Sequence, residues 1–142
     1  MMTNLDIAKA LFENISSEGE VSTTDALALV DDNVIWEVCN GPNEKYLPFS
    51  GTFHGKVGVE NWIAELNEHV EMEQIDRNYI EAEKGHVFCY GDARMRVRGR
   101  LTTFFFIEWV IIENGKVVKY KEVIDTARII HCMKNYDRFE QD

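Results

Sequence analysis

An Asn-Gly pair between two apolar runs constrains the fold of this chain more than any other feature. Residues 102–113 and 117–124 are rich in β-branched and aromatic side chains, and Asn114 and Gly115 lie between them. Both residue types adopt positive φ at low cost, which the two-residue turn of a β-hairpin requires. The pattern therefore predicts a long antiparallel hairpin in the C-terminal half of the chain.

The rest of the chain divides into helical and strand-like segments. Apolar residues recur every three or four positions in the helical segments, whereas the strand-like segments end at turn residues such as Lys84-Gly85 and Arg98-Gly99. We expect helices at 5–15, 23–30 and 59–70, strands at 35–39, 74–83 and 87–97, and a loop at 40–55 that holds both prolines.

Helices followed by an antiparallel meander predict an α+β domain, in which a curved antiparallel sheet wraps around about three helices. A curled sheet packed on helices commonly encloses a concave apolar pocket. The chain has 142 residues, which is the length of one ordinary domain. We expect this domain to cover residues 1–132, followed by a polar C-terminal tail at 133–142.

The composition excludes several classes of partner. A formal net charge of −10 repels phosphate backbones and anionic lipid headgroups, so we expect neither nucleic-acid nor membrane binding. The apolar runs are far shorter than the roughly 20 residues that span a bilayer, and the N-terminus lacks the basic region of a signal peptide. The three cysteines and four histidines show no metal-ligand spacing. These features predict a cytoplasmic protein with no metal site and no cofactor.

Glu122 is the main candidate for a catalytic residue. If the hairpin pairs outward from its turn without irregularity, Trp109 lies opposite Tyr120 and Ile107 opposite Glu122, all on one face. Glu122 is then the only charged residue on an apolar face, where lost hydration raises the pKa of a carboxyl group and suits it to acid–base chemistry. The alternative is a structural carboxylate that a nearby Arg, Tyr or water satisfies.

Three residues of the preceding strand extend this candidate site. The same register places Tyr90, Asp92 and Arg94 on the face that carries Glu122, as catalytic partners or substrate contacts. The alternating apolar residues further along this strand indicate that its opposite side is buried there, so a bulge at Gly91-Asp92 is needed to reconcile the two halves. The alternative for Asp92 and Arg94 is a solvated strand end.

Aromatic side chains supply the expected pocket wall. A single tryptophan is usually a core residue, but three tryptophans and two tyrosines that converge on one carboxylate favour a ligand pocket. A lone histidine such as His54, in the loop before the third helix, more often closes a loop by a hydrogen bond. The expected substrate-binding residues are Trp36, Phe49, His54, Trp62, Arg94, Ile107, Trp109 and Tyr120.

The opposite face of the hairpin predicts self-association. In the same register it combines a Glu108–Lys121 pair with apolar side chains that are too numerous to leave in water, so we expect a homodimer through this face. The apolar residues are Phe104, Phe106, Val110, Ile112 and Val123.

Two motifs resemble a known family. Residues 48–62 (PFSGTFHGKVGVENW) contain Pro-aromatic-x-Gly-x-x-x-Gly and then Val and Trp on a helix. Residues 114–130 (NGKVVKYKEVIDTARII) contain an Asn-Gly-Lys turn and then an aromatic, a basic and an acidic residue. Together with the order of helices and strands over about residues 5–130, they resemble the SnoaL-like polyketide cyclase branch of the ketosteroid-isomerase and nuclear-transport-factor-two-like superfamily.

The resemblance implies a cone-shaped α+β barrel with a deep apolar pocket, dimerisation through the outer sheet face, and metal-free chemistry of several kinds. In epoxide-hydrolase-like members the acid after an aromatic-basic pair lies in the pocket, and Tyr120-Lys121-Glu122 matches that position. Their Arg-x-Asp motif is reversed here as Asp92-Ala93-Arg94, so we do not predict epoxide hydrolysis. Ketosteroid isomerases form an oxyanion site from an acid and a tyrosine, and the resemblance offers Tyr90 as that tyrosine.

These observations support two functional hypotheses. The first is a cofactor-independent enzyme of isomerase, aldol cyclase, dehydratase or hydrolase type, acting on a small apolar or carbonyl-bearing molecule. Glu122 would move a proton or activate water, while Tyr90, Asp92 or Arg94 stabilises the developing charge. The second is a non-catalytic module of the same fold that binds an apolar ligand or mediates dimerisation. The two differ in whether Asp92 or Arg94 reaches the Glu122 pocket.

Overall fold

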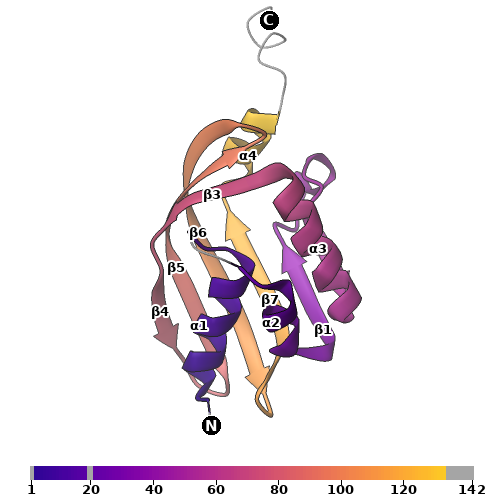
Figure 1. Cartoon of the computed structure of the whole chain (residues 1–142), viewed down its shortest axis with the longest axis vertical. Helices are drawn as coiled ribbons and strands as arrows, with labels where there is room; N and C mark the ends of the chain where they lie inside the picture. Colours follow the sequence, from indigo (N-terminus) through magenta and orange to yellow (C-terminus); the bar gives the residue numbers. More distant parts are fainter. Residues whose placement is uncertain (1, 19–20, 134–142) are drawn as a thin grey trace, which may run out of the picture.

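The structure is a computed structural model that describes residues 2–18 and 21–133. Within these residues the chain forms helices and a seven-stranded sheet, and the α+β class is confirmed (Figure 1). The elements are α1 (Asn4–Ile15), α2 (Thr23–Ala28), β1 (Val30–Val38), the short 3-10 helix η1 (Glu44–Tyr46), β2 (Gly51–His54), α3 (Gly55–His69), β3 (Val70–Ile75), β4 (Asn78–Glu81), β5 (His86–Val97), β6 (Arg100–Glu113), β7 (Lys116–Ile124) and α4 (Thr126–Met133).

The predicted turns are present. Lys84-Gly85, Arg98-Gly99 and Asn114-Gly115 each have positive φ at both positions, between 51° and 83°. Arg98-Gly99 joins β5 to β6 and Asn114-Gly115 joins β6 to β7 in two residues, whereas Lys84-Gly85 lies in the longer connection from β4 to β5. These turns produce the predicted meander.

The sheet is mixed, not purely antiparallel as predicted. Its strand order is β2-β1-β7-β6-β5-β3, and β4 also pairs with β5. The pair formed by β1 and β7 is parallel, and the two strands are not joined by a hairpin, since η1, β2, α3 and β3 to β6 lie between them in the sequence. The segment predicted as a loop, 40–55, contains η1 and the edge strand β2, whose four residues are too few to show a strand periodicity.

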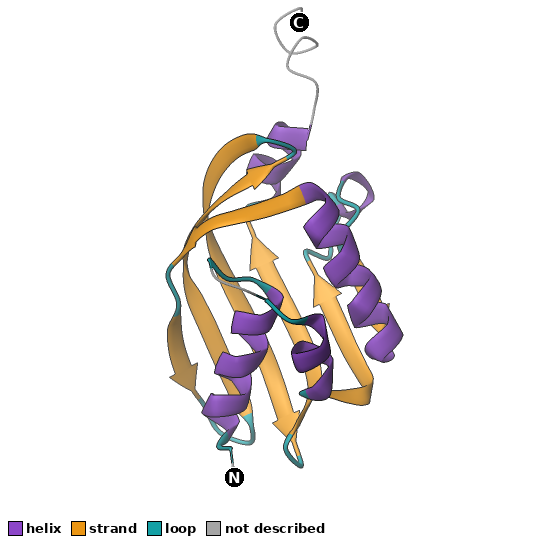
Figure 2. Cartoon of the chain, viewed as in Figure 1, coloured by secondary structure: helices purple, strands orange, loops and turns teal. Residues whose placement is uncertain are grey.

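The curved sheet is open, and α1, α2 and α3 cover its concave face (Figure 2). The N-terminus of α1 has a capping box, in which Thr3 Oγ1 accepts from Asp6 N and Asp6 Oδ2 accepts from Thr3 N, both at 3.1 Å. Trp36, Trp62 and Tyr120 are the largest fully buried side chains. They lie between the sheet and α3, so the densest aromatic packing is next to the candidate site.

The chain leaves β7 into α4, which packs against β5 and β6. The predicted tail, 133–142, therefore begins at the last residue of this helix, and residues 134–142 lie outside the described part of the chain. None of the helices that the structure describes is long and apolar enough to cross a lipid bilayer.

A β-bulge in the β6–β7 hairpin changes which residues face inward. Near the turn Ile112 pairs with Val117, but the next pair is Ile111 with Lys119, so Val118 is an extra residue in β7. Beyond the bulge Glu108 lies directly opposite Glu122. The register without irregularity was wrong by one residue, which moves a set of side chains to the other face.

Gly91 allows the connection between β3 and β4 to lie against β5. Asp76 N donates to Asp92 O at 2.9 Å, and a Cβ atom added at Gly91 would lie 1.7 Å from Asp76 O. The predicted bulge at Gly91-Asp92 is absent, since the β5–β6 register runs unbroken from His86 to Val97. This glycine therefore serves a close approach between backbones.

We predict that Gly91→Ala lowers the free energy of unfolding by about 3 kcal/mol, the upper end of overpacking costs, because a backbone atom cannot rotate away from the new methyl group. Gly99→Ala is the control: its Cβ would meet nothing within 4 Å, and only its positive φ of +83° adds a cost of about 1 kcal/mol. Denaturant titration measures both. Equal losses would contradict the close approach at Gly91.

Candidate active site

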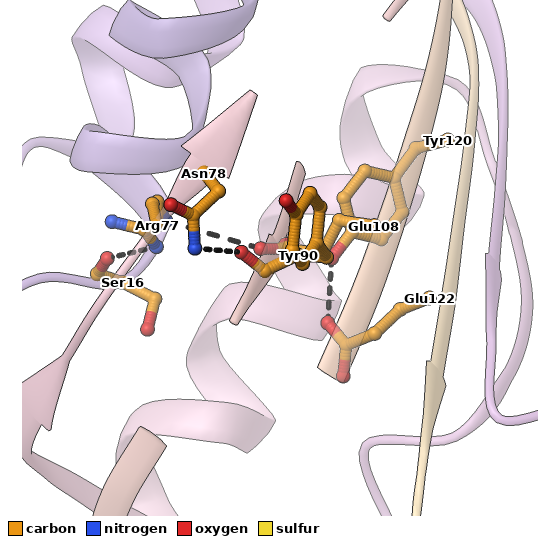
Figure 3. A network of polar contacts seen from close by, with 7 residues as sticks. All are labelled: Ser16, Arg77, Asn78, Tyr90, Glu108, Tyr120 and Glu122. Atoms are coloured by element: carbon orange, nitrogen blue, oxygen red, sulfur yellow. Dashed lines mark hydrogen bonds and ion pairs between the residues drawn. The ribbon is translucent and has the colours of Figure 1, made fainter. Parts of the chain in front are cut away.

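Two glutamates share one tyrosine hydroxyl at the inner face of the hairpin. Tyr120 Oη lies 2.6 Å from Glu108 Oε2 and 2.5 Å from Glu122 Oε2 (Figure 3). Glu108 is 4% exposed, Tyr120 is fully buried and Glu122 is half-buried. All three side chains lie on one side because Glu108 and Glu122 are directly opposite on neighbouring strands and Tyr120 is two residues from Glu122.

The geometry requires a proton on one of the two carboxyl groups. The hydroxyl of Tyr120 carries one proton and can donate to only one carboxylate. The second short contact is favourable when the other carboxyl group is protonated and donates to Tyr120 Oη. The three groups therefore form a hydrogen-bonded chain that holds one proton more than two ionised glutamates would.

The pKa values of the three groups follow from their burial. Burial first, and then the neighbouring Glu108 carboxylate, raise the pKa of Glu122 to about 8. Burial also raises the pKa of Glu108, opposed by Arg77 and by the hydrogen bond from Tyr120. Burial and both carboxylates raise the pKa of Tyr120 well above its ordinary value. At neutral pH the site thus holds an acid, and Tyr120 stays neutral.

Stacked aromatic rings hold Tyr120 in place. The rings of Trp36 and Tyr120 are nearly parallel, at 8°, with centroids 3.8 Å apart, and Trp62 lies 5.9 Å from Tyr120. Trp62 Nε1 in turn donates to Phe49 O at 2.9 Å. This stack restricts the hydroxyl to a position between the two carboxyl groups.

An apolar cavity of about 300 Å³ opens beside the two glutamates. Its lining residues come from α1 and the segment that follows it, from Phe49 before β2, and from α3, β3, β5, β6 and β7. The lining residues are Ile15, Ser16, Ser17, Glu18, Val21, Phe49, Trp62, Leu66, Asn67, Val70, Glu71, Met72, Ile75, Met95, Phe104, Phe106, Glu108, Glu122 and Ile124. The volume suits a small organic molecule.

The structure brings some of the predicted site residues together. Phe49, Trp62 and Glu122 line the cavity. Trp36 and Tyr120 are fully buried behind its wall, where they contact each other and not the open space. His54 is exposed at the start of α3 and does not line the cavity.

The other predicted site residues lie on the opposite face of the sheet. Tyr90, Asp92 and Arg94 do share a face with Ile107 and Trp109, but that face is the outer one. Tyr90, Asp92, Arg94 and Ile107 are exposed there, and half-buried Trp109 donates from Nε1 to His86 Nδ1 at 3.0 Å. Placing them beside Glu122 was wrong, because the bulge at Val118 turns Glu122 inward while they stay outside.

Two residues of the site were not predicted from the sequence. Glu108 was expected on the outer face, paired with Lys121, yet it faces the cavity opposite Glu122. Arg77, in the connection between β3 and β4, reaches into the interior, where its side chain is 8% exposed and Nε lies 3.9 Å from Glu108 Oε1. Its Nη2 donates to Ser16 O at the end of α1.

A group of possible metal ligands lies away from the cavity glutamates. Glu65, Glu68 and His69 bring three ligand atoms within 4.8 Å of one another at the end of α3. The Nε of Arg98 donates to His69 Nδ1 at 3.2 Å, and His69 Nε2 lies 3.6 Å from Glu65. Both ring nitrogens thus have partners within the protein, and we assign this group no metal.

Comparison with known proteins identifies the structural class of the fold. No model of a known protein family matches the sequence, and no curated protein matches it. Among solved structures, an NTF2-like protein of unknown function from Burkholderia pseudomallei matches with a TM-score of 0.81 and 23% identity, over 95% of this chain and 100% of that one. TerC, co-crystallised with polyporic acid, matches with a TM-score of 0.74 and 17% identity, over 93% and 98%.

A protein from Pseudomonas putida, proposed to be a polyketide cyclase, matches with a TM-score of 0.76 and 13% identity, over 92% of this chain and 98% of that one. These likenesses cover nearly the whole of each chain. The protein therefore has the NTF2-like fold, in agreement with the resemblance of its sequence to SnoaL-like proteins.

The raised pKa of Glu122 predicts a pH dependence of stability. In the unfolded chain Glu122 loses its proton near its ordinary pKa of 4.5, whereas the folded protein keeps it to about 8. Between these values the folded state binds more protons, so the free energy of unfolding falls as the pH rises, by at most about 1.4 kcal/mol per pH unit. Denaturant titrations between pH 5 and pH 8 measure this slope, over a range that the two pKa values bracket.

Glu122→Gln removes the titration with little change of shape, so this variant is expected to lose that part of the slope. Glu113→Gln, at the exposed end of β6, is the matched control and is expected to keep it. The same slope in the wild-type protein and in Glu122→Gln would show that Glu122 has an ordinary pKa in the folded state.

Proposed function

We propose that this protein is an acid–base enzyme that acts, without a cofactor, on a small apolar molecule bearing a carbonyl group. The observation that carries the proposal is the Glu108–Tyr120–Glu122 chain, which presents two carboxyl groups to an apolar cavity. Two carboxyl groups whose environments separate their pKa values are the usual basis of an acid and a base in one site. The site supports the enzyme hypothesis, with Glu108 in place of Tyr90, Asp92 and Arg94 as the partner of Glu122.

The proposed reaction begins with enolisation. The Glu108 carboxylate removes a proton from the carbon next to the carbonyl group, and the C–H electron pair forms the enol double bond. The Glu122 carboxyl group donates its proton to the carbonyl oxygen, so no free enolate forms. Return of a proton to a different carbon of a conjugated substrate, with loss of the enol proton, gives an isomer.

Tyr120 can restore the starting protonation state. After enolisation Glu108 holds the substrate proton and Glu122 is ionised. Tyr120 accepts a proton from Glu108 as it donates its own to Glu122, across contacts of 2.6 and 2.5 Å. This transfer conserves every proton and needs no movement of the buried side chains.

The charges around the cavity indicate which ligands it accepts. Its ionisable lining residues are Glu18, Glu71, Glu108 and Glu122, and none of the described lining residues is Lys, Arg or His. A carboxylate or phosphate on the substrate would meet only negative charge in an apolar space. We therefore expect neutral ligands to bind better than anionic ones. The TerC structure with polyporic acid supports a small-molecule role for the fold, although that ligand belongs to TerC.

The test follows exchange of carbon-bound protons in a panel of enolisable bicyclic ketones and esters, with β-tetralone as the first probe. In D₂O, the protons next to the carbonyl group are expected to disappear from the proton NMR spectrum faster with the protein than with buffer alone. Glu122→Gln should lower this exchange rate by about 100-fold or more, and Glu113→Gln should leave it unchanged. A carboxylate-bearing analogue of β-tetralone is expected to bind more weakly than β-tetralone itself.

Two outcomes would contradict the enzyme proposal. Binding of the ketones without exchange above the buffer rate would favour the binding module instead. Undiminished exchange with Glu122→Gln would remove Glu122 from the proposed chemistry, whichever ligand is used.

We also infer that two copies of this chain associate through the outer sheet face. Four of the five residues expected there, Phe104, Phe106, Val110 and Ile112, are buried inside, because the bulge reverses the faces of β6 relative to β7. The fifth, Val123, is 54% exposed, and Phe105 at 52% and Ile107 at 39% are exposed with it. Ile107 pairs with both Tyr90 and Val123, so these side chains form one continuous patch, which we call the outer apolar patch.

The charges around the outer apolar patch favour a second copy of the chain as the partner. Lys119 and Lys121 lie 3.4 and 3.6 Å from Glu37, and Arg94 and Arg96 lie 3.5 and 2.6 Å from Glu73. These ion pairs combine four positive with two negative charges, on a chain with a net charge of −10. Two such faces therefore meet without the repulsion between excess carboxylates that the rest of the surface would cause. The free, buried cysteines 39, 89 and 132 also fit the cytoplasm expected from the sequence.

The oligomer prediction uses substitutions matched for chemistry. Sedimentation velocity at micromolar concentration is expected to give the mass of two chains for the wild-type protein and of one chain for Ile107→Glu, because a carboxylate at the centre of the outer apolar patch cannot be desolvated without a partner. Val57→Glu, at an exposed position on α3, should remain dimeric. A monomeric wild-type protein at this concentration would refute the dimer.

A further inference from the structure

The two cavity glutamates, Glu108 and Glu122, differ in burial. This difference by itself would place their shared proton on the more buried carboxyl group. Both contact Tyr120 Oη at nearly the same distance, 2.6 Å for Glu108 and 2.5 Å for Glu122. Glu108 is only 4% exposed, whereas Glu122 is half-buried. Burial penalises the charged form of a carboxyl group, so burial alone would place the proton on Glu108. A neutral Glu108 could not serve as the base.

We propose that Arg77 is a positioning residue that reverses this order: it keeps Glu108 ionised and so leaves the shared proton on Glu122, the glutamate nearer the solvent. The inference rests on the proposed function for its catalytic meaning, although the location of the proton is a property of the free protein. Arg77 itself does not line the cavity and acts through Glu108.

The contacts of Arg77 favour one glutamate over the other. Its Nε lies 3.9 Å from Glu108 Oε1, the oxygen that Tyr120 does not use, and Arg77 forms no ion pair with Glu122 in the described part of the chain. The side chain of Arg77 is 8% exposed and that of Glu108 is 5% exposed, so water screens this attraction little. A buried guanidinium cannot lose its proton, and its charge is satisfied best by an ionised Glu108.

The backbone fixes Arg77 in this place. Arg77 follows Asp76 in the two-residue connection from β3 to β4, and this connection lies against β5 at Gly91, where no side chain could fit. The Nη2 of Arg77 donates to Ser16 O, which ties the guanidinium to the end of α1 (Figure 3). The charge is therefore held from two sides and does not depend on a flexible surface side chain.

The other ionisable groups near Glu108, Tyr120 and Glu122 do not favour ionisation of Glu108 over ionisation of Glu122. Cys89 and Tyr79 lie on the β4–β5 side near Arg77 and Glu108, Glu13 of α1 is near Tyr79, and Cys39 is near Glu122. Burial raises the pKa of Cys89 to about 12 and the pKa values of Cys39 and Tyr79 further, so these three groups are neutral at pH 7. Lys9 lies over the ring of Tyr79, 5.3 Å from its centroid. Within residues 2–18 and 21–133, Arg77 lowers the pKa values of both glutamates and forms its ion pair with Glu108.

Carbon-detected NMR of protein with labelled glutamate side chains tests the proposal, with signals assigned from Glu108→Gln and Glu122→Gln. At pH 7 the wild-type protein is expected to show a protonated Glu122 and an ionised Glu108. In Arg77→Met, which removes the charge and keeps the length, the assignment should reverse. Arg77→Lys keeps the charge and should keep the wild-type assignment. Arg94→Met, on the outer face, is the matched control and should also keep it.

The wild-type spectrum alone can overturn the proposal, so it does not depend on whether Arg77→Met folds: a protonated Glu108, or a proton shared equally, would contradict it. Folded Arg77→Met with the proton still on Glu122 would also contradict it. The result is independent of turnover. If the proton moves to Glu108 in Arg77→Met but the wild-type protein does not exchange ketone protons, only the proposed function is contradicted. If the wild-type protein exchanges ketone protons but the proton stays on Glu122 in Arg77→Met, only the role of Arg77 is contradicted.

Discussion

The hydroxyl of Tyr120 between two carboxyl groups is the interaction on which the rest of the site depends. Glu108 and Glu122 lie opposite each other on adjacent strands, and two ionised carboxylates there would repel each other across an apolar wall. One retained proton removes the repulsion and completes the hydrogen bonds of the hydroxyl. The stacking of Trp36 on Tyr120 supports this arrangement, because it holds the hydroxyl within hydrogen-bond distance of both carboxyl groups.

Features set by local chemistry could be predicted from the sequence. The turns at Arg98-Gly99 and Asn114-Gly115 depend on residue pairs that accept positive φ. Such signals lie within a few residues of one another, so no knowledge of the packed core is needed. The placement of Glu122 and Tyr120 on one face was also predicted, but the partner Glu108 was not, because partners across a sheet depend on register.

The register depended on one residue, Val118, and the sequence does contain a signal for the bulge. Pairing without irregularity places Lys119 opposite Val110, on a side that also carries Phe106 and Ile112. Burying a lysine among those side chains is costly. Two consecutive valines, Val117 and Val118, precede the Lys-Tyr-Lys alternation, and an extra residue at this point lets both the valine and the tyrosine face inward. Periodicity within one strand does not show this conflict, which appears only when both strands are compared.

The same bulge also explains how one sheet carries two different surfaces. On the inner side it brings Glu108, Tyr120 and Glu122 together, and on the outer side it brings Lys119 and Lys121 to Glu37. Without it, the two lysines would share a face with Glu108, and an ion pair in the core would take the place of the shared proton. A lysine partner would keep Glu108 ionised but would leave it on the face opposite to Tyr120 and Glu122, which share a face because they are two residues apart on β7. Arg77 provides the positive charge from a different element, so β7 remains free to supply both the tyrosine and the acid.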